Sequence, residues 1–178
     1  MRKSFWMIVI YILAGLIVGL LILAAFMPRK YQVEKSVIIA KPVADVKGRI
    51  IDLENYSRWN PWQQMDPAAQ KRITGRAGAP GHKYEWNGKK VGNGSLTLQA
   101  TDDRSANFDL EFIKPMKSKA KDNWQFEPIG ENETRVTWNN HGGLSYPSAR
   151  LIGPFLKKNL NKQFTTGLEN LKKMCEDC

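Results

Sequence analysis

Histidine and cysteine, two residue types that often act as bases, nucleophiles or metal ligands, are rare in this sequence of 178 residues. The chain contains two histidines, His82 and His141, and two cysteines, Cys175 and Cys178. Two histidines without metal-ligand spacing are too few for a zinc site. No nucleophile elbow, phosphate-binding loop or dinucleotide-binding fingerprint occurs along the chain. We therefore expect neither a metal nor another cofactor.

The two cysteines form a C-x-x-C pair at the C-terminal end of the sequence. A redox-active cysteine is favoured at a helix N-terminus, because the helix dipole there lowers the thiol pKa. This pair follows a predicted helix, where the dipole acts in the opposite direction. One C-x-x-C pair also supplies only half of a structural zinc site. We interpret Cys175 and Cys178 as part of a frayed tail and leave their role open.

A clearer chemical signal is a pair of polar residues on a predicted apolar face. Side chains of a strand alternate between the two faces of a sheet, so Asp122 shares a face with Trp124, and Asn140 with Trp138. Ligand pockets often combine an apolar lining with a few polar groups. Asp122 or His141 is alternatively a candidate general acid or base. Asp122 and Asn140 could also lie at solvated strand ends, or a bulge could reset the alternation.

Hydrophobic periodicity predicts the elements that position these residues. Residues 31–40 alternate like a half-buried strand, 42–53 have helical spacing, and the aromatic, turn-rich segment 54–67 predicts a second short helix. Six further segments have the period of two that is typical of strands: 70–74, 82–86, 94–101, 105–113, 118–129 and 134–141. A long amphipathic helix is predicted over 154–174. An antiparallel sheet must bury its apolar face, and only this last helix is long enough to cover it.

The first thirty residues have a different composition from the rest. Residues 5–27 contain no charged side chain and are flanked by basic residues at 2–3 and 29–30. A helix of about 20 apolar residues spans the hydrocarbon core of a bilayer. We therefore predict a short basic tail at 1–4, a transmembrane helix at 5–27 and one globular domain at 28–178. A cleaved signal peptide, whose apolar region is usually only about 7–15 residues, and a buried core helix are the alternatives.

The charge pattern bears on partners and on membrane orientation. The net charge is +10, and four of the 27 basic side chains lie in the first thirty residues, which leaves 23 basic and 17 acidic side chains for the domain. A basic domain beside a bilayer is attracted to anionic headgroups. Nucleic acid is not an expected partner, because no recognition motif occurs. We predict a single-pass protein of a bacterial-type inner or plasma membrane. Basic residues after the helix favour a cytoplasmic domain, whereas a signal anchor would export it, so the side stays open.

Several short motifs in a fixed order resemble the SRPBCC superfamily, also called START-like or helix-grip. The resemblance covers residues 31–174 and points to the branch named after polyketide cyclases and dehydrases, in its membrane-tethered variant. The motifs that carry it are IIAKPVADV at 38–46, YSRWNPW at 56–62, YEW at 84–86, VGNG at 91–94, FIKP at 112–115, FEP at 126–128 and TRVTW at 134–138.

This resemblance implies an α+β helix-grip fold, with an antiparallel sheet wrapped around the C-terminal helix and a hydrophobic cavity between them. It does not fix the function, because one fold serves many functions. We favour a monomeric binding module for a lipid-like or other hydrophobic small molecule. A cyclase or dehydrase that uses Asp122 or His141, and an interaction domain without a cavity, are the alternatives. The predicted cavity residues are Trp59, Trp62, Tyr84, Trp86, Phe108, Phe112, Asp122, Trp124, Trp138, Asn140 and Phe164.

Overall fold

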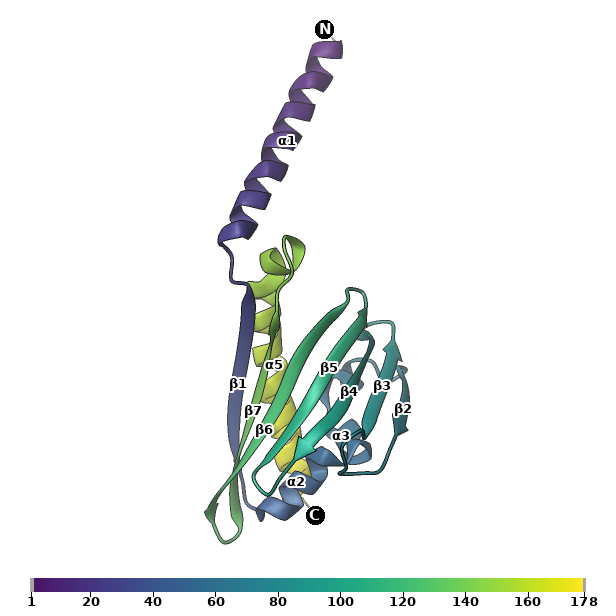
Figure 1. Cartoon of the computed structure of the whole chain (residues 1–178), viewed down its shortest axis with the longest axis vertical. Helices are drawn as coiled ribbons and strands as arrows, with labels where there is room; N and C mark the ends of the chain where they lie inside the picture. The colour runs from purple at the N-terminus through teal and green to yellow at the C-terminus, as the bar shows by residue number, and fades with distance from the viewer. Residues whose placement is uncertain (1, 178) are drawn as a thin grey trace.

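The computed structural model describes the backbone of residues 2–177 and the side chains of residues 5–177. One long helix stands apart from a domain in which a curved sheet surrounds a second long helix (Figure 1). The elements are α1 (Arg2–Phe26), β1 (Lys30–Ile39), α2 (Val43–Ile51), α3 (Leu53–Trp59), α4 (Pro61–Met65), β2 (Gln70–Thr74), β3 (Lys83–Gly88), β4 (Gly92–Thr101), β5 (Ser105–Lys114), β6 (Ser118–Gly130), β7 (Glu133–Gly143) and α5 (Ser148–Glu176).

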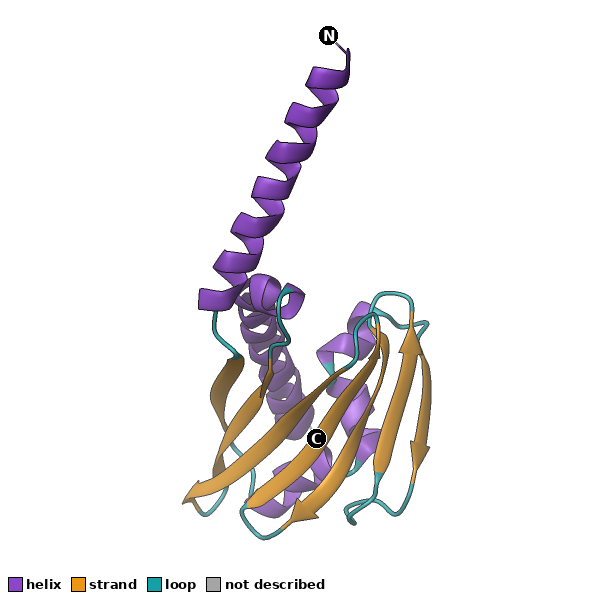
Figure 2. Ribbon diagram, turned by 45° about the horizontal axis from the view of Figure 1, so that its top comes forward, coloured by secondary structure: helices purple, strands orange, loops and turns teal. Residues whose placement is uncertain are grey.

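The seven strands form one antiparallel sheet in the order β1-β7-β6-β5-β4-β3-β2. Strands β2 to β7 are a meander, and β1 returns to pair with β7, from Lys30 opposite Gly143 to Ile39 opposite Thr134. All the helices except α1 lie on the concave side of the sheet (Figure 2). The predicted α+β helix-grip fold, with the sheet wrapped around the C-terminal helix, is confirmed.

A glycine lets α5 approach the sheet closely. Phe164, Leu168 and Leu171 of α5 are buried against the concave face. Between them lies Gly167, where an added Cβ would be 2.9 Å from the Trp138 ring and 3.2 Å from Pro61. The absence of a side chain at this position allows the helix backbone to rest directly on the tryptophan.

The segment between β1 and β2 contains three helices rather than the two that were predicted. Asp52 ends α2 and begins α3, where its carboxylate accepts a hydrogen bond from the Glu54 amide at 3.0 Å. Asn60 then accepts a hydrogen bond from the Trp62 amide at 2.9 Å, and Pro61 occupies the first position of α4. Two short polar caps and one proline therefore divide the segment, which periodicity alone does not resolve.

Helix α5 begins at Ser148, six residues before the predicted start at Pro154. Ala149 and Gly153, in the first turns of α5, are buried. An added Cβ at Gly153 would lie 2.7 Å from the Leu144 side chain, so the first turns pack tightly on the end of β7. This packing outweighs the preference of proline for the first turn of a helix.

Two further predictions were wrong. The period of two that was predicted for 94–101 places Ala100 on one face with the buried Leu96 and Leu98, but Ala100 is exposed, because a register shift between β4 and β5 follows Leu98. Cys175 is not part of a frayed tail: it lies in the last turns of α5 and is buried in the core. Cys178 lies outside the described residues.

Helix α1 is long and apolar enough to cross a membrane over Phe5–Phe26, by length and composition. The described contacts of α1 with the domain lie near its C-terminal end, where Ala24 is buried and the Tyr146 hydroxyl donates a hydrogen bond to the Leu21 carbonyl at 3.1 Å. The rest of its apolar surface is exposed.

We predict that a chain beginning at Arg29 folds as a soluble monomer. The cut must spare Arg29, because its carbonyl accepts a hydrogen bond from the Leu144 amide at 2.8 Å. Circular dichroism should show sheet and helix, and size-exclusion chromatography should show one monomeric peak. A chain beginning at Ser36 lacks the first half of β1, including the buried Val33, and should be markedly less stable. Insoluble chains that never refold from both starting points would contradict the domain boundary.

Candidate ligand-binding site

Most of the predicted cavity residues form one connected aromatic cluster. Eight of the eleven side chains are buried, and Trp62, Trp86 and Phe112 are partly exposed. Ring contacts join Trp59, Trp62, Trp124, Trp138 and Phe164 in one group and Tyr84, Trp86 and Phe112 in a second.

Tyr56 connects the two groups and was missed by the sequence analysis. Its ring lies 4.9 Å from that of Trp59 and 6.0 Å from that of Tyr84, centroid to centroid. Burial, together with the charge of Asp122, raises the pKa of the Tyr56 hydroxyl well above its ordinary value. The sequence pattern could have identified Tyr56, because it lies three residues before Trp59 and the two side chains therefore share a helix face.

The centre of the cluster is filled by stacked rings. The Trp138 ring stacks on Trp124 at 4.4 Å and on Phe164 at 3.9 Å, with interplanar angles of 21° and 11°. Trp59 meets both tryptophans edge-on, at 5.9 Å and 6.0 Å. In this region the side chains that were predicted to line a cavity contact one another.

Asp122 lies at the centre of a hydrogen-bond network beneath these rings. Its Oδ1 accepts hydrogen bonds from Trp138 Nε1 at 2.8 Å and Asn140 Nδ2 at 2.9 Å, and its Oδ2 accepts one from Trp124 Nε1 at 3.2 Å. The Tyr31 hydroxyl donates to Asn140 Oδ1 at 2.9 Å and extends the network toward β1. Among the described residues, no buried side-chain nitrogen or oxygen lacks a hydrogen-bond partner.

Burial dominates the electrostatics of Asp122. Desolvation raises the pKa of its carboxyl to about 6, although the donors Trp138, Asn140 and Trp124 all favour the charged form. The same burial, with a contribution from the charge of Asp122, raises the pKa of Tyr31 to about 12. Tyr31, a further residue that sequence reasoning missed, therefore stays protonated and acts as a donor to Asn140.

The two residues proposed as acid or base lie on opposite faces of the sheet. Asp122 pairs with Asn140 across β6 and β7 and is buried, whereas His141 pairs with Lys121 and is partly exposed. His141 Nδ1 lies 3.2 Å from Asn139 Oδ1, on its own strand. The structure therefore does not bring Asp122 and His141 together, and the two cannot act as an acid–base pair on one substrate.

Two of the three partly exposed rings, Trp86 and Phe112, lie where β3, β4 and β5 approach the end of the domain that carries α1. Trp86 crosses over Gly94 of the neighbouring strand, where an added Cβ would lie within 2.4 Å of its ring. Phe112 packs edge-on against Trp86 at 5.7 Å, and Trp86 Nε1 donates a hydrogen bond to the Val91 carbonyl at 3.3 Å. A strand glycine thus provides the room for an aromatic pair at this end of the sheet.

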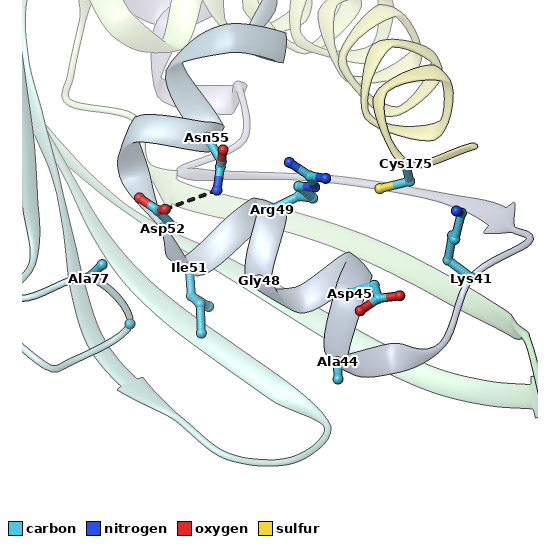
Figure 3. A pocket seen from close by; sticks show the side chains of 11 residues that line it. Lys41, Ala44, Asp45, Gly48, Arg49, Ile51, Asp52, Asn55, Ala77 and Cys175 are labelled. Carbon is cyan, nitrogen blue, oxygen red and sulfur yellow. Dashed lines mark hydrogen bonds between the residues drawn. The ribbon is translucent and has the colours of Figure 1, made fainter. Parts of the chain in front are cut away.

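Two surface hollows lie elsewhere, and neither is lined by any of the eleven predicted residues. One, of about 530 Å³, lies beside α2 and is polar, with Lys41, Asp45, Arg49 and Asp52 around it (Figure 3). The other, of about 550 Å³, lies over the strands near the start of β1, and His141 is among its lining residues. No group of three or more metal-ligating side chains occurs among the described residues.

A sequence profile described as "Polyketide cyclase / dehydrase and lipid transport" matches residues 30–176. The chain belongs to this family. The match covers every strand and helix of the helix-grip domain, from β1 to α5, and leaves out residues 1–29 and 177–178. The family assignment supports a ligand-binding domain in general, as the sequence resemblance implied.

Several solved structures share the fold. A Thermus thermophilus protein aligns with a TM-score of 0.63 at 19% identity, over 83% of this chain and 98% of its own. A Streptomyces aromatase/cyclase aligns with 0.61 at 14%, over 83% and 94%. Norcoclaurine synthase from Thalictrum flavum, solved with dopamine and hydroxybenzaldehyde, aligns with 0.61 at 10%, over 83% and 87%. These identities establish the fold alone. No curated protein sequence matches the chain.

We predict that Asp122→Asn lowers the free energy of unfolding by about 1–3 kcal/mol at neutral pH, because one donor would then face the amide NH₂. The variant should also change the pH dependence of stability. Since the folded pKa of about 6 exceeds the ordinary value of 3.8, the native state binds the proton more tightly. The resulting stabilisation of the folded state amounts to about 3 kcal/mol. It is complete below pH 3.8 and is lost as the pH rises through 6.

Urea unfolding at several pH values measures this effect. The difference in unfolding free energy between the parent and Asp122→Asn should change between pH 4 and pH 7, in the parent's favour at low pH. A difference that stays constant across this range would contradict a buried, desolvated carboxyl group.

We also predict that Gly167→Ala lowers the free energy of unfolding by about 1–3 kcal/mol, because the added methyl group overpacks against Trp138. Gly48→Ala in α2 is the matched control, since no atom lies within 4 Å of its added Cβ. The control should gain up to about 1 kcal/mol from helix propensity. Equal gains in thermal or urea stability for both variants would show that α5 does not rest on Trp138.

Proposed function

We propose that this protein is a membrane-anchored binding domain for an apolar small molecule, held in the wedge between the concave face of the sheet and α5. The observation that carries the proposal is the set of partly exposed rings, Trp62, Trp86 and Phe112, next to the fully packed aromatic cluster. A ligand that contacts these rings would continue the apolar packing of the core toward the end of the sheet at which Trp86 and Phe112 lie. Aromatic side chains provide large apolar contact areas for such a ligand.

The state of Asp122 favours binding over catalysis. A general acid or base must reach a proton of the substrate within hydrogen-bond distance. Asp122 is buried, and both of its oxygens already accept hydrogen bonds from N–H donors of Trp124, Trp138 and Asn140. We therefore assign Asp122 a structural role, in which it orients the two indole rings that form the floor of the wedge.

The anchor in this proposal is α1. Its apolar stretch covers Phe5–Phe26, is almost entirely unburied, and is long enough to cross a bilayer. The hydrogen bond from Tyr146 to Leu21 and the buried Ala24 join the end of α1 to the domain. Neither a cleaved signal sequence nor a core helix requires such a junction. An anchored domain would take up its ligand from the membrane or deliver it there. A lipid-like molecule is the class of ligand that fits this location.

We predict that the chain beginning at Arg29 binds an apolar fluorescent probe saturably, and that Phe112→Lys weakens the binding about tenfold or more. A lysine at this position places a charge on the apolar side of the wedge. Ile113→Lys is the matched control: it is the next residue on β5, it is exposed, and it faces the outer side of the sheet. The control should bind the probe as the parent does.

Fluorescence titration distinguishes the alternatives. Binding that does not saturate, or equal losses in Phe112→Lys and Ile113→Lys, would argue for a packed interaction domain without an interior site. Turnover of a polyketide-like or lipid substrate that disappears in Asp122→Asn while binding persists would instead establish the cyclase or dehydrase alternative.

A further inference from the structure

The domain has two ends, and α1 leaves from one of them. Because the strands are antiparallel, the end that carries α1 (the anchor end) collects the segments 28–30, 66–70, 88–92, 114–118 and 143–148. The opposite end collects 39–43, 74–83, 101–105 and 130–133. The hairpin loops between β3 and β4 and between β5 and β6 lie at the same end of the sheet as the base of α1 (Figure 1).

Charge is distributed unequally between the two ends. The anchor end contains six basic side chains and one carboxyl group, Asp66, which is buried and accepts a hydrogen bond from the Lys90 amide. The opposite end contains four basic and four acidic side chains. The basic side chains of the anchor end are Arg29, Lys30, Lys89, Lys90, Lys114 and Lys117.

Exposed apolar side chains accompany these charges. Met116, in the loop between β5 and β6, is 40% exposed and reaches Ser148 at the start of α5, with 3.9 Å between the hydroxyl and the sulfur. Tyr146, 48% exposed, bonds to α1 and lies beneath the Arg150 guanidinium. Farther along α5, Ile152 and Phe155 are exposed. Apolar groups interspersed with cations are the composition of surfaces that lie at a membrane interface.

We infer that the anchor end docks on an anionic bilayer surface, with Met116 and its apolar neighbours at the acyl boundary and the six cations against lipid phosphates. The inference rests on the proposed anchor, because α1 holds this end within reach of the headgroups. Basic side chains beside an anionic leaflet are attracted to it within about one Debye length. In the docked orientation the end of the sheet that contains Trp86 and Phe112 faces the lipid rather than water.

The test uses the full chain in lipid nanodiscs of phosphatidylcholine, alone or mixed with phosphatidylglycerol. An environment-sensitive fluorophore is attached at Met116→Cys, and at Asn132→Cys in the turn at the opposite end. Each cysteine is introduced into a chain that already carries Cys178→Ser. The Cys178→Ser chain without an introduced cysteine is labelled in parallel as the control for non-specific labelling. Quenching by lipids that carry a nitroxide then reports which end of the domain contacts the bilayer.

We expect the fluorophore at Met116→Cys to be quenched several-fold more strongly than the one at Asn132→Cys, and only with the anionic lipid. The pair Lys89→Glu and Lys117→Glu should abolish the difference. The pair Arg76→Glu and Arg104→Glu changes the net charge equally at the opposite end and should leave it intact. Salt at about 1 M, where the Debye length is about 3 Å, should weaken the quenching.

The outcomes separate this inference from the proposed function. A chain that does not stay with the nanodiscs would refute the anchor itself. A chain that stays, but shows equal quenching at both positions or in both lipids, or the same response to both charge-reversal pairs, would overturn the docked orientation while leaving the anchored binding domain in place.

Discussion

The carboxyl group of Asp122 is the constraint on which the rest of the domain depends. A carboxyl group buried on an apolar face is unfavourable unless its oxygens are hydrogen-bonded. Here two indole N–H groups and one amide satisfy them, which fixes Trp124 and Trp138 in the orientation that lets them stack. The stacked indoles form the surface on which Phe164 of α5 packs. One polar network thus sets how the last helix meets the sheet.

The packing around this network divides the aromatic side chains into a closely packed central group and a partly exposed group. Gly167 brings the α5 backbone onto Trp138, so the wedge is closed and filled at its centre. Toward the anchor end, Gly94 leaves room for Trp86, and the aromatic side chains become partly exposed. The closely packed part stabilises the grip, and the region of the partly exposed rings is where we place the ligand. Because α1 leaves from this same end, α1 and the Trp86–Phe112 pair lie at one end of the domain.

Much of this arrangement could be predicted from the sequence, because strand alternation is a strict geometric rule. It placed Asp122 and Asn140 on the core face with Trp124 and Trp138, and the structure buries all four. The rule failed at Ala100, where a register shift that has no sequence signature reset the alternation. Strand alternation also does not predict contacts between segments that are distant in the sequence. The early start of α5 depends on its packing against Leu144, and Cys175 is buried because the core surrounds it. The role of Tyr31 depends on its hydrogen bond to Asn140, which is 109 positions away in the sequence.

The central claim, that Asp122 is structural and that an apolar ligand binds beside the network rather than in it, is tested most directly by the indole N–H signals in nuclear magnetic resonance spectra. We expect the signals of Trp124 and Trp138 to shift together with a midpoint near pH 6, as Asp122 ionises. An apolar ligand should shift the signals of Trp62 and Trp86 and leave these two nearly unchanged. Indole signals of Trp124 and Trp138 that ignore pH, or that exchange rapidly with water and move most when ligand is added, would contradict the account.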